Sequence, residues 1–260
     1  PALARAKAKA NRVKCTGNLG TINKALNDFA NDTENDHRYP WNCLDNAKAE
    51  HFGAGDSQSL GNILAVAAVK NGLGSAKAVL SPCDPGRAQA NENAAGAWDG
   101  FTAKNAGIPA DAISYVLIDG ADALRAETIL ATTRNLSGCD LSGATWLGAD
   151  SHPGEDATMA GLTAGQGQLT TTDGGTRQSN NADIGAGGLL IKAHLAARGG
   201  ISKETATTGV IGCAGGFPDF AAVNGGKAYT GQSHWNNHGS LKNASGVNLP
   251  GNDFAFRFDG

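Results

Sequence analysis

The stretch PALARAKAKANRVKCTGNLGTINKALNDFA, residues 1–30, decides the fold because it predicts one long helix with two unlike halves. Its second half carries an apolar ladder at the three- and four-residue steps of a single helix face: Leu19, Ile22, Leu26 and Phe29. The pattern predicts a helix of about 30 residues, about 45 Å long. We expect residues 15–30 to pack on a sheet in the body through this ladder.

The first half of this helix has little apolar surface to bury. Residues 1–14 are rich in alanine and basic side chains, and only a thin stripe that includes Leu3 and Val13 is apolar. We therefore expect residues 1–14 to project from the body as a stem that contacts other subunits. The residues assigned to this stem contact are Pro1, Leu3, Arg5, Lys7, Lys9, Arg12, Val13 and Lys14.

Charge is distributed unevenly along the chain. Residues 1–24 contain six basic residues and no acid, although the whole chain has a net charge of −3. A basic arm on an acidic body suits nucleic acid, an anionic membrane surface, or self-association between unlike parts. The arm lacks interleaved aromatic residues, and its alanine content suits close helix contacts, so we expect no nucleic-acid partner.

The remaining residues, 31–260, predict a single globular head, because no stretch reads as a linker between two domains. Charged residues make up only 17% of the chain and there are 37 glycines, which indicates many turns and irregular loops. Apolar spacing predicts a helix over 60–68 and another within 181–200. Strands are predicted within 76–85, at 112–118, at 127–133 and at 254–258, and Asp173-Gly174 predicts a hairpin turn within 165–179. Extended loops are expected within 180–250.

Five cysteines, at positions 15, 43, 83, 139 and 213, are too far apart for a C-x-x-C motif. Wide spacing with low charge is typical of disulfides in an oxidising compartment, whereas buried free thiols are the plain alternative. The odd count leaves at least one cysteine over, and Cys15 on the opening helix is our choice. Four cysteines allow three pairings, and our hypothesis is Cys43–Cys83 with Cys139–Cys213.

No motif for catalysis or cofactor binding stands out. The chain has no G-x-S-x-G, H-E-x-x-H, phosphate-binding loop or dinucleotide fingerprint, so we expect neither an enzyme nor a small-molecule substrate. His234 and His238 have metal-ligand spacing only on a helix, which their Gly/Asn-rich surroundings disfavour. Calcium is an alternative to a plain polar loop at DSHPGED, residues 150–156, and near Asn252, Asp253 and Asp259.

Several segments resemble bacterial type IV pilin-like proteins and type II secretion pseudopilins, especially the large relatives from planctomycetes and verrucomicrobia. The specific part is PALARAKAKANRVKCTGNLGTINKAL, in which Pro1-Ala2-Leu3, Cys15 and Asn18-Leu19 occur in the order of the segment that follows the membrane helix in that family. Weaker likenesses are VLSPCDP at 79–85, ISYVLIDGADALRAETILATTRN at 113–135, and the strand-Asp-Gly endings GQGQLTTTDGG and DFAFRFDG. Residues 180–250 match nothing in the family's pattern.

The resemblance implies an α+β pilin-like fold, in which a long N-terminal helix packs on an antiparallel sheet with Gly-rich loop insertions. It also implies about 20 apolar residues before Pro1 in the precursor, enough to cross a bilayer. The function implied is a structural subunit of an extracellular or periplasmic pilus-like or pseudopilus filament that assembles with copies of itself. The alternative is a membrane-anchored cell-surface protein whose head binds glycan or calcium and does not polymerise.

Overall fold

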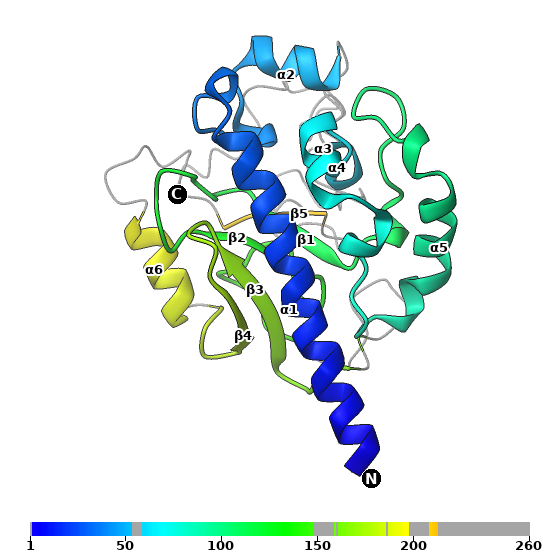
Figure 1. The fold of residues 1–260 in the computed structure, drawn as a ribbon. Coiled ribbons are helices and arrows are strands. Elements are labelled where there is room, and N and C mark those ends of the chain that lie inside the picture. Colours follow the sequence, from blue (N-terminus) through cyan, green and yellow to red (C-terminus); the bar gives the residue numbers. More distant parts are fainter. Residues whose placement is uncertain are drawn as a thin grey trace, which may run out of the picture.

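A long helix lying against an antiparallel sheet defines the α+β architecture of the chain (Figure 1). The computed structural model describes residues 2–53, 59–147, 159, 161–185, 187–197 and 208–212. The helices in these ranges are α1 (Ala2–Ala30), α2 (Asp45–Phe52), α3 (Leu60–Leu64), α4 (Ala67–Leu73), α5 (Ala88–Gly96) and α6 (Leu189–Ala197). The strands are β1 (Tyr115–Ile118), β2 (Ile129–Thr133), β3 (Gln166–Thr171), β4 (Thr176–Asn180) and β5 (Val210–Ile211).

The sheet has the order β4-β3-β2-β1-β5 within the described residues, and every neighbouring pair is antiparallel. Strands β3 and β4 form the predicted hairpin, with Gln168 opposite Gln178. The Asp173 carboxylate accepts hydrogen bonds from the Thr171 hydroxyl at 2.6 Å and the Gly175 amide at 3.1 Å. Gly174 has a φ of 90°, which glycine adopts without the strain of a side chain. The turn chemistry therefore sets this part of the sheet locally.

The prediction of a long helix at the N-terminus is confirmed by α1, which crosses the sheet with α4 beside it (Figure 1). Its apolar ladder, Leu19, Ile22, Leu26 and Phe29, is buried in the common core. Gly72 lets α4 pass close to α1, because a Cβ atom at that position would lie 2.8 Å from the Cβ of Ala25. Helix α1 is thus held between the sheet and α4.

Two local predictions differ from the structure. The helix expected over 60–68 is split into α3 and α4, with the break at Ala65 and Val66. The strand expected within 76–85 is wrong, since residues Ala76–Val79 form a 3-10 helix. The Asn91 side chain donates to the carbonyl oxygen of Ala76 at 2.7 Å, and the Ser114 backbone amide donates to the carbonyl oxygen of Val79 at 2.9 Å. The segment is therefore held at both ends as a 3-10 helix.

Candidate functional site

The N-terminal part of α1 is the candidate interaction site, and we call residues 1–14 the stem, of which the structure describes 2–14. Leu3 is 83% exposed and Val13 64% exposed, and Cys15 is the first buried residue of the helix. The basic side chains of Arg5, Lys7, Lys9 and Lys14 are exposed, whereas Arg12 is half-buried. In Figure 1 the end of α1 marked N extends away from the rest of the molecule. The stem thus offers basic and apolar side chains that the body does not cover.

The first hydrogen bonds between the body and α1 occur slightly before residue 15. The Asn11 side chain donates to the Pro82 carbonyl at 3.3 Å, and the Gln168 side chain donates to the Arg12 carbonyl at 3.0 Å. Asn18 donates to the Leu80 carbonyl at 2.7 Å. These bonds come from opposite sides of the helix, the 80–82 loop and strand β3, so they hold the base of the stem in place.

A buried polar network fixes the position of α1 along the sheet. The Asn23 side chain donates to the Thr170 hydroxyl at 2.8 Å and to the Thr171 carbonyl at 2.7 Å. Asn27 donates to the Asn23 side-chain oxygen at 2.9 Å and accepts from the Tyr39 hydroxyl at 2.7 Å. Apolar packing tolerates small shifts of α1 along the sheet, but a shift of α1 by one residue would break each of these buried hydrogen bonds. The spacing of these two asparagines beside the apolar ladder was the signal that sequence reasoning missed.

The structure does not support the proposed Cys43–Cys83 disulfide. Cys15, Cys43 and Cys83 are all free buried thiols, and Cys43 and Cys83 contact different parts of the molecule. The Cys43 thiol donates to the Tyr39 carbonyl at 3.4 Å, beside the C-terminal end of α1. Burial raises its pKa to about 11. The Cys83 backbone amide instead donates to the Ser81 hydroxyl, which in turn donates to the Cys15 sulfur. Cys15 lies about 18 Å along α1 from Asn27, the residue that the Tyr39 hydroxyl contacts. The two cysteines are therefore anchored near different turns of α1.

Exposed carboxylates gather at the C-terminal end of α1, and we call Asp28, Asp32, Glu34 and Asp36 the acidic pole. Residues 25–50 hold six carboxylates and two basic side chains. Lys24 pairs with Asp28 at 2.8 Å and Arg38 with Asp36 at 3.5 Å, both at exposed positions. A helix C-terminus favours cations, yet the last turn of α1 has no basic residue. The stability of the helix itself therefore does not explain the acidic pole.

Several predicted residues lie outside the described residues. They are Pro1, residues 150–156 with their calcium alternative, Cys213, His234, His238, Asn252, Asp253, Asp259, the strand at 254–258 and most of the 180–250 loops. Cys139 is buried, but its proposed pairing with Cys213 lies outside the described residues for the same reason.

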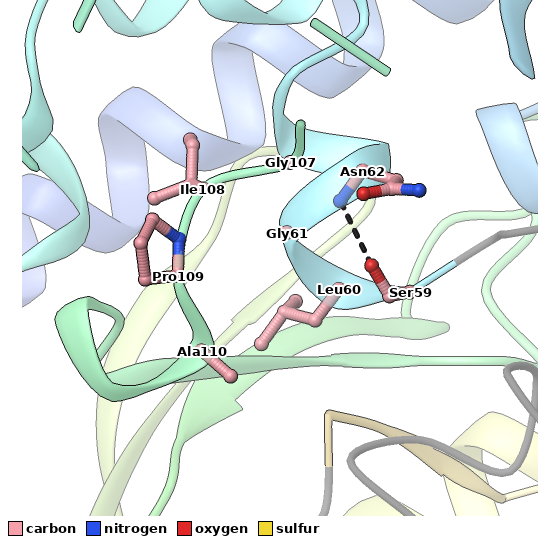
Figure 2. A pocket seen from close by; sticks show the side chains of 8 residues that line it. All are labelled: Ser59, Leu60, Gly61, Asn62, Gly107, Ile108, Pro109 and Ala110. Carbon is pink, nitrogen blue, oxygen red and sulfur yellow. Dashed lines mark hydrogen bonds between the residues drawn. The ribbon is translucent and has the colours of Figure 1, made fainter. Parts of the chain in front are cut away.

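A small hollow lies between the start of α3 and the segment after α5 (Figure 2). It is lined by Ser59, Leu60, Gly61, Asn62, Gly107, Ile108, Pro109 and Ala110. Its volume is about 170 Å³, below the roughly 300–1,000 Å³ of typical ligand pockets. The Ser59 hydroxyl already accepts a hydrogen bond from the backbone amide of Asn62 at 3.1 Å, as the dashed line in Figure 2 shows. None of the eight residues is ionisable, so the hollow offers packing space rather than chemistry.

The described residues lack both a membrane-spanning helix and a metal-binding cluster. No helix among them is long and apolar enough to cross a membrane, and they contain no group of three or more metal-ligating side chains. Comparisons with protein-family models, with curated proteins and with solved structures found no match. The arrangement of α1, its stem and the acidic pole is therefore the feature of the molecule that bears on function.

Proposed function

We propose that this chain is a structural subunit of a pilin-like filament in which the stem of each subunit contacts a neighbouring copy. The observation that carries this proposal is the division of α1. Its second half is buried against the sheet, while its first half exposes Leu3, Val13 and four basic side chains. Beyond the bonds that hold Asn11 and Arg12 at its base, the stem is largely exposed, and an isolated helical segment of this length is only marginally stable in water. Contact with another molecule would stabilise it.

The acidic pole supports a second copy of the chain as that molecule. It lies at the opposite end of α1 from the stem, about 35 Å away by helix rise. A basic surface and an acidic surface at the two ends of one molecule make heterologous, head-to-tail contacts, and such contacts generate rings or open helical filaments. The complementary charges would steer association and set its direction.

The free energies of burial and association indicate that the stem contact orients assembly but does not drive it alone. Burying Leu3 and Val13 would contribute about 1.5–3 kcal/mol each. Association costs about 4–15 kcal/mol in lost translational and rotational freedom, and only the stabilisation beyond this cost contributes to affinity. Further contacts are needed, and the apolar segment implied by the pilin resemblance would supply them while anchoring the precursor in the membrane.

The test is charge reversal in the native gene, read out by electron microscopy of surface fibres. A stem variant carrying Arg5→Glu, Lys7→Glu and Lys9→Glu should reduce fibre number at least tenfold, while the soluble chain keeps its circular dichroism spectrum and melting temperature. A matched control reverses three exposed charges elsewhere, Lys104, Arg177 and Lys192, and should assemble normally.

A complementary variant tests the acidic pole as the partner surface. With Asp32, Glu34 and Asp36 changed to lysine, this variant should also fail to assemble alone. Co-expressed with the stem variant it should form fibres again, because each stem then meets a pole of opposite charge. Normal assembly of the stem variant would refute the stem contact, and failure of co-expression to restore fibres would refute the acidic pole. Native material without fibres that binds calcium or glycan would favour the non-polymerising surface protein.

A further inference from the structure

We propose that Cys15 and Cys83 are a disulfide-forming pair that fastens α1 to the body at the point where the stem begins. The proposal concerns the chain itself and holds whether or not the chain polymerises. It replaces the Cys43–Cys83 pairing and gives Cys15, which sequence reasoning left unpaired, a partner.

The two sulfurs share one buried site. The Ser81 hydroxyl donates to the Cys15 sulfur at 3.0 Å, and the same oxygen accepts from the Cys83 backbone amide at 3.1 Å. The Tyr115 hydroxyl donates to the Cys15 sulfur at 3.3 Å. Cys15 is 0% exposed and Cys83 1% exposed. A single serine oxygen thus spans the two cysteines.

The loop that carries Cys83 is held firmly from its other side. Asp84 accepts two hydrogen bonds from the Arg134 guanidinium, at 2.7 and 2.9 Å, and both side chains are buried. Gly161 leaves room for the Cys83 side chain, since a Cβ atom there would lie 2.6 Å from the sulfur. Asn11 binds the Pro82 carbonyl at 3.3 Å. The cysteine is therefore confined against α1, which favours a bond to Cys15 over a bond to a distant thiol.

The chemical environment of the pair differs from that of Cys43. The hydrogen bond from Cys15 lowers the pKa of Cys83, and the nearby Ser81 and the positive charge of Arg12 act in the same direction. Burial raises the pKa of Cys15. Cys83 is thus the thiol that ionises first, and the thiolate is the nucleophile in disulfide exchange.

The bond forms by exchange with an external disulfide, such as oxidised glutathione or the disulfide of a periplasmic oxidase. The Cys83 thiolate attacks one sulfur of that disulfide, releases the other as a thiolate, and forms a mixed disulfide. Cys15 then loses its proton and attacks the Cys83 sulfur, which releases the second external thiolate. Two electrons pass to the external disulfide, and the two protons end on its two thiols. Because both cysteines are buried in the docked protein, the first attack takes place before α1 docks or while it is transiently undocked, when neither thiol has the pKa of the docked pair. The second attack follows when docking brings Cys15 back to Cys83.

A bond at this place would close a loop of about 70 residues, and loops of that length give large stabilisation from a crosslink. It would join the helix to the body at the first buried residue of α1, so that a pull on the stem could not peel the helix off the sheet. The fold would then transmit force from the stem through a covalent bond as well as through the core.

Peptide mapping tests the connection directly in the full wild-type chain. The protein is refolded with glutathione and its disulfide, blocked with an alkylating reagent, and digested with trypsin without reduction. Cleavage after Lys14, Lys24, Lys77 and Arg87 releases peptides 15–24 and 78–87. We expect these two peptides as one linked species, while peptide 39–48 carries an alkylated Cys43. Recovery of 15–24 and 78–87 separately, each alkylated, would overturn the proposal.

A melting experiment supplies a second, independent readout. Oxidised wild-type protein should melt about 5–15 °C above the reduced protein. Cys15→Ser and Cys83→Ser should each reduce that difference by the same amount, while Cys43→Ser, which also removes a buried thiol, should keep it in full. A difference as large in both Cys15→Ser and Cys83→Ser as in the wild type would assign it to other cysteines. Should either variant fail to fold, the peptide map of the wild-type chain still decides.

Discussion

Two leucines on the same helix provide the sharpest test of how α1 is used. Leu26 is 0% exposed and lies in the core, whereas Leu3 is 83% exposed on the stem. Changing each to alanine removes the same atoms, from the first turn of α1 at Leu3 and from further along the helix at Leu26. Leucine and alanine differ little in intrinsic helix propensity, so a difference of several kcal/mol between the two variants reports tertiary packing.

The expected costs follow from burial. Leu26→Ala should lower the free energy of unfolding by about 2–5 kcal/mol, because it removes buried apolar surface and leaves a cavity between α1, α4 and the sheet. Leu3→Ala should change it by no more than about 0.5 kcal/mol, as is usual for an exposed position. Leu3→Ala should nevertheless reduce fibre formation, if the stem contacts a neighbouring copy.

Urea unfolding of the soluble chain, followed by far-ultraviolet circular dichroism, measures both free energies, and equal m-values would show that the comparison is valid. A loss above about 1 kcal/mol in Leu3→Ala would show that the stem packs within its own molecule, and this would refute the reasoning behind the proposed function. A loss below about 1 kcal/mol in Leu26→Ala would show that α1 is not held by its apolar ladder.

Two further predictions concern single side chains. Asp84→Asn should cost about 3–5 kcal/mol of unfolding free energy, because it removes a buried negative charge that contacts the buried guanidinium of Arg134 at 2.7 Å; the exposed control Asp111→Asn should stay within about 0.5 kcal/mol in the same urea titration. Burial lowers the pKa of His51 below its ordinary value of 6.5, so its contribution to stability is complete above pH 6.5 and is lost as the pH falls through the lowered folded-state value. Stability of the wild-type chain should therefore fall more steeply than that of His51→Gln on acidification below pH 6.5, and an NMR titration giving a His51 pKa at or above 6.5 would contradict this.

Parts of the fold that depend on neighbouring residues could be predicted from sequence. The ladder of Leu19, Ile22, Leu26 and Phe29 predicted α1, since a buried face repeats with the period of the helix itself. Asp173 and Gly174 predicted the β3–β4 hairpin, because side-chain and backbone bonds within the turn favour it. The exposed stem likewise follows from a local lack of apolar surface.

Other features depend on segments far apart in the chain, and only the tertiary structure decided them. Residues 76–79 form a 3-10 helix where a strand was predicted, and the contacts that hold them, from the Asn91 side chain and the Ser114 backbone amide, come from distant positions in the chain. Cysteine positions alone allow several pairings, and the docking of the 80–84 loop on α1 selects Cys83 as the neighbour of Cys15. The acidic pole is a candidate partner surface for the stem only because it lies at the opposite end of α1. Helical periodicity and turn-forming residues can be recognised from residues that are close together in the sequence. Strand pairing, sulfur contacts and the placement of opposite charges depend on how the whole chain packs.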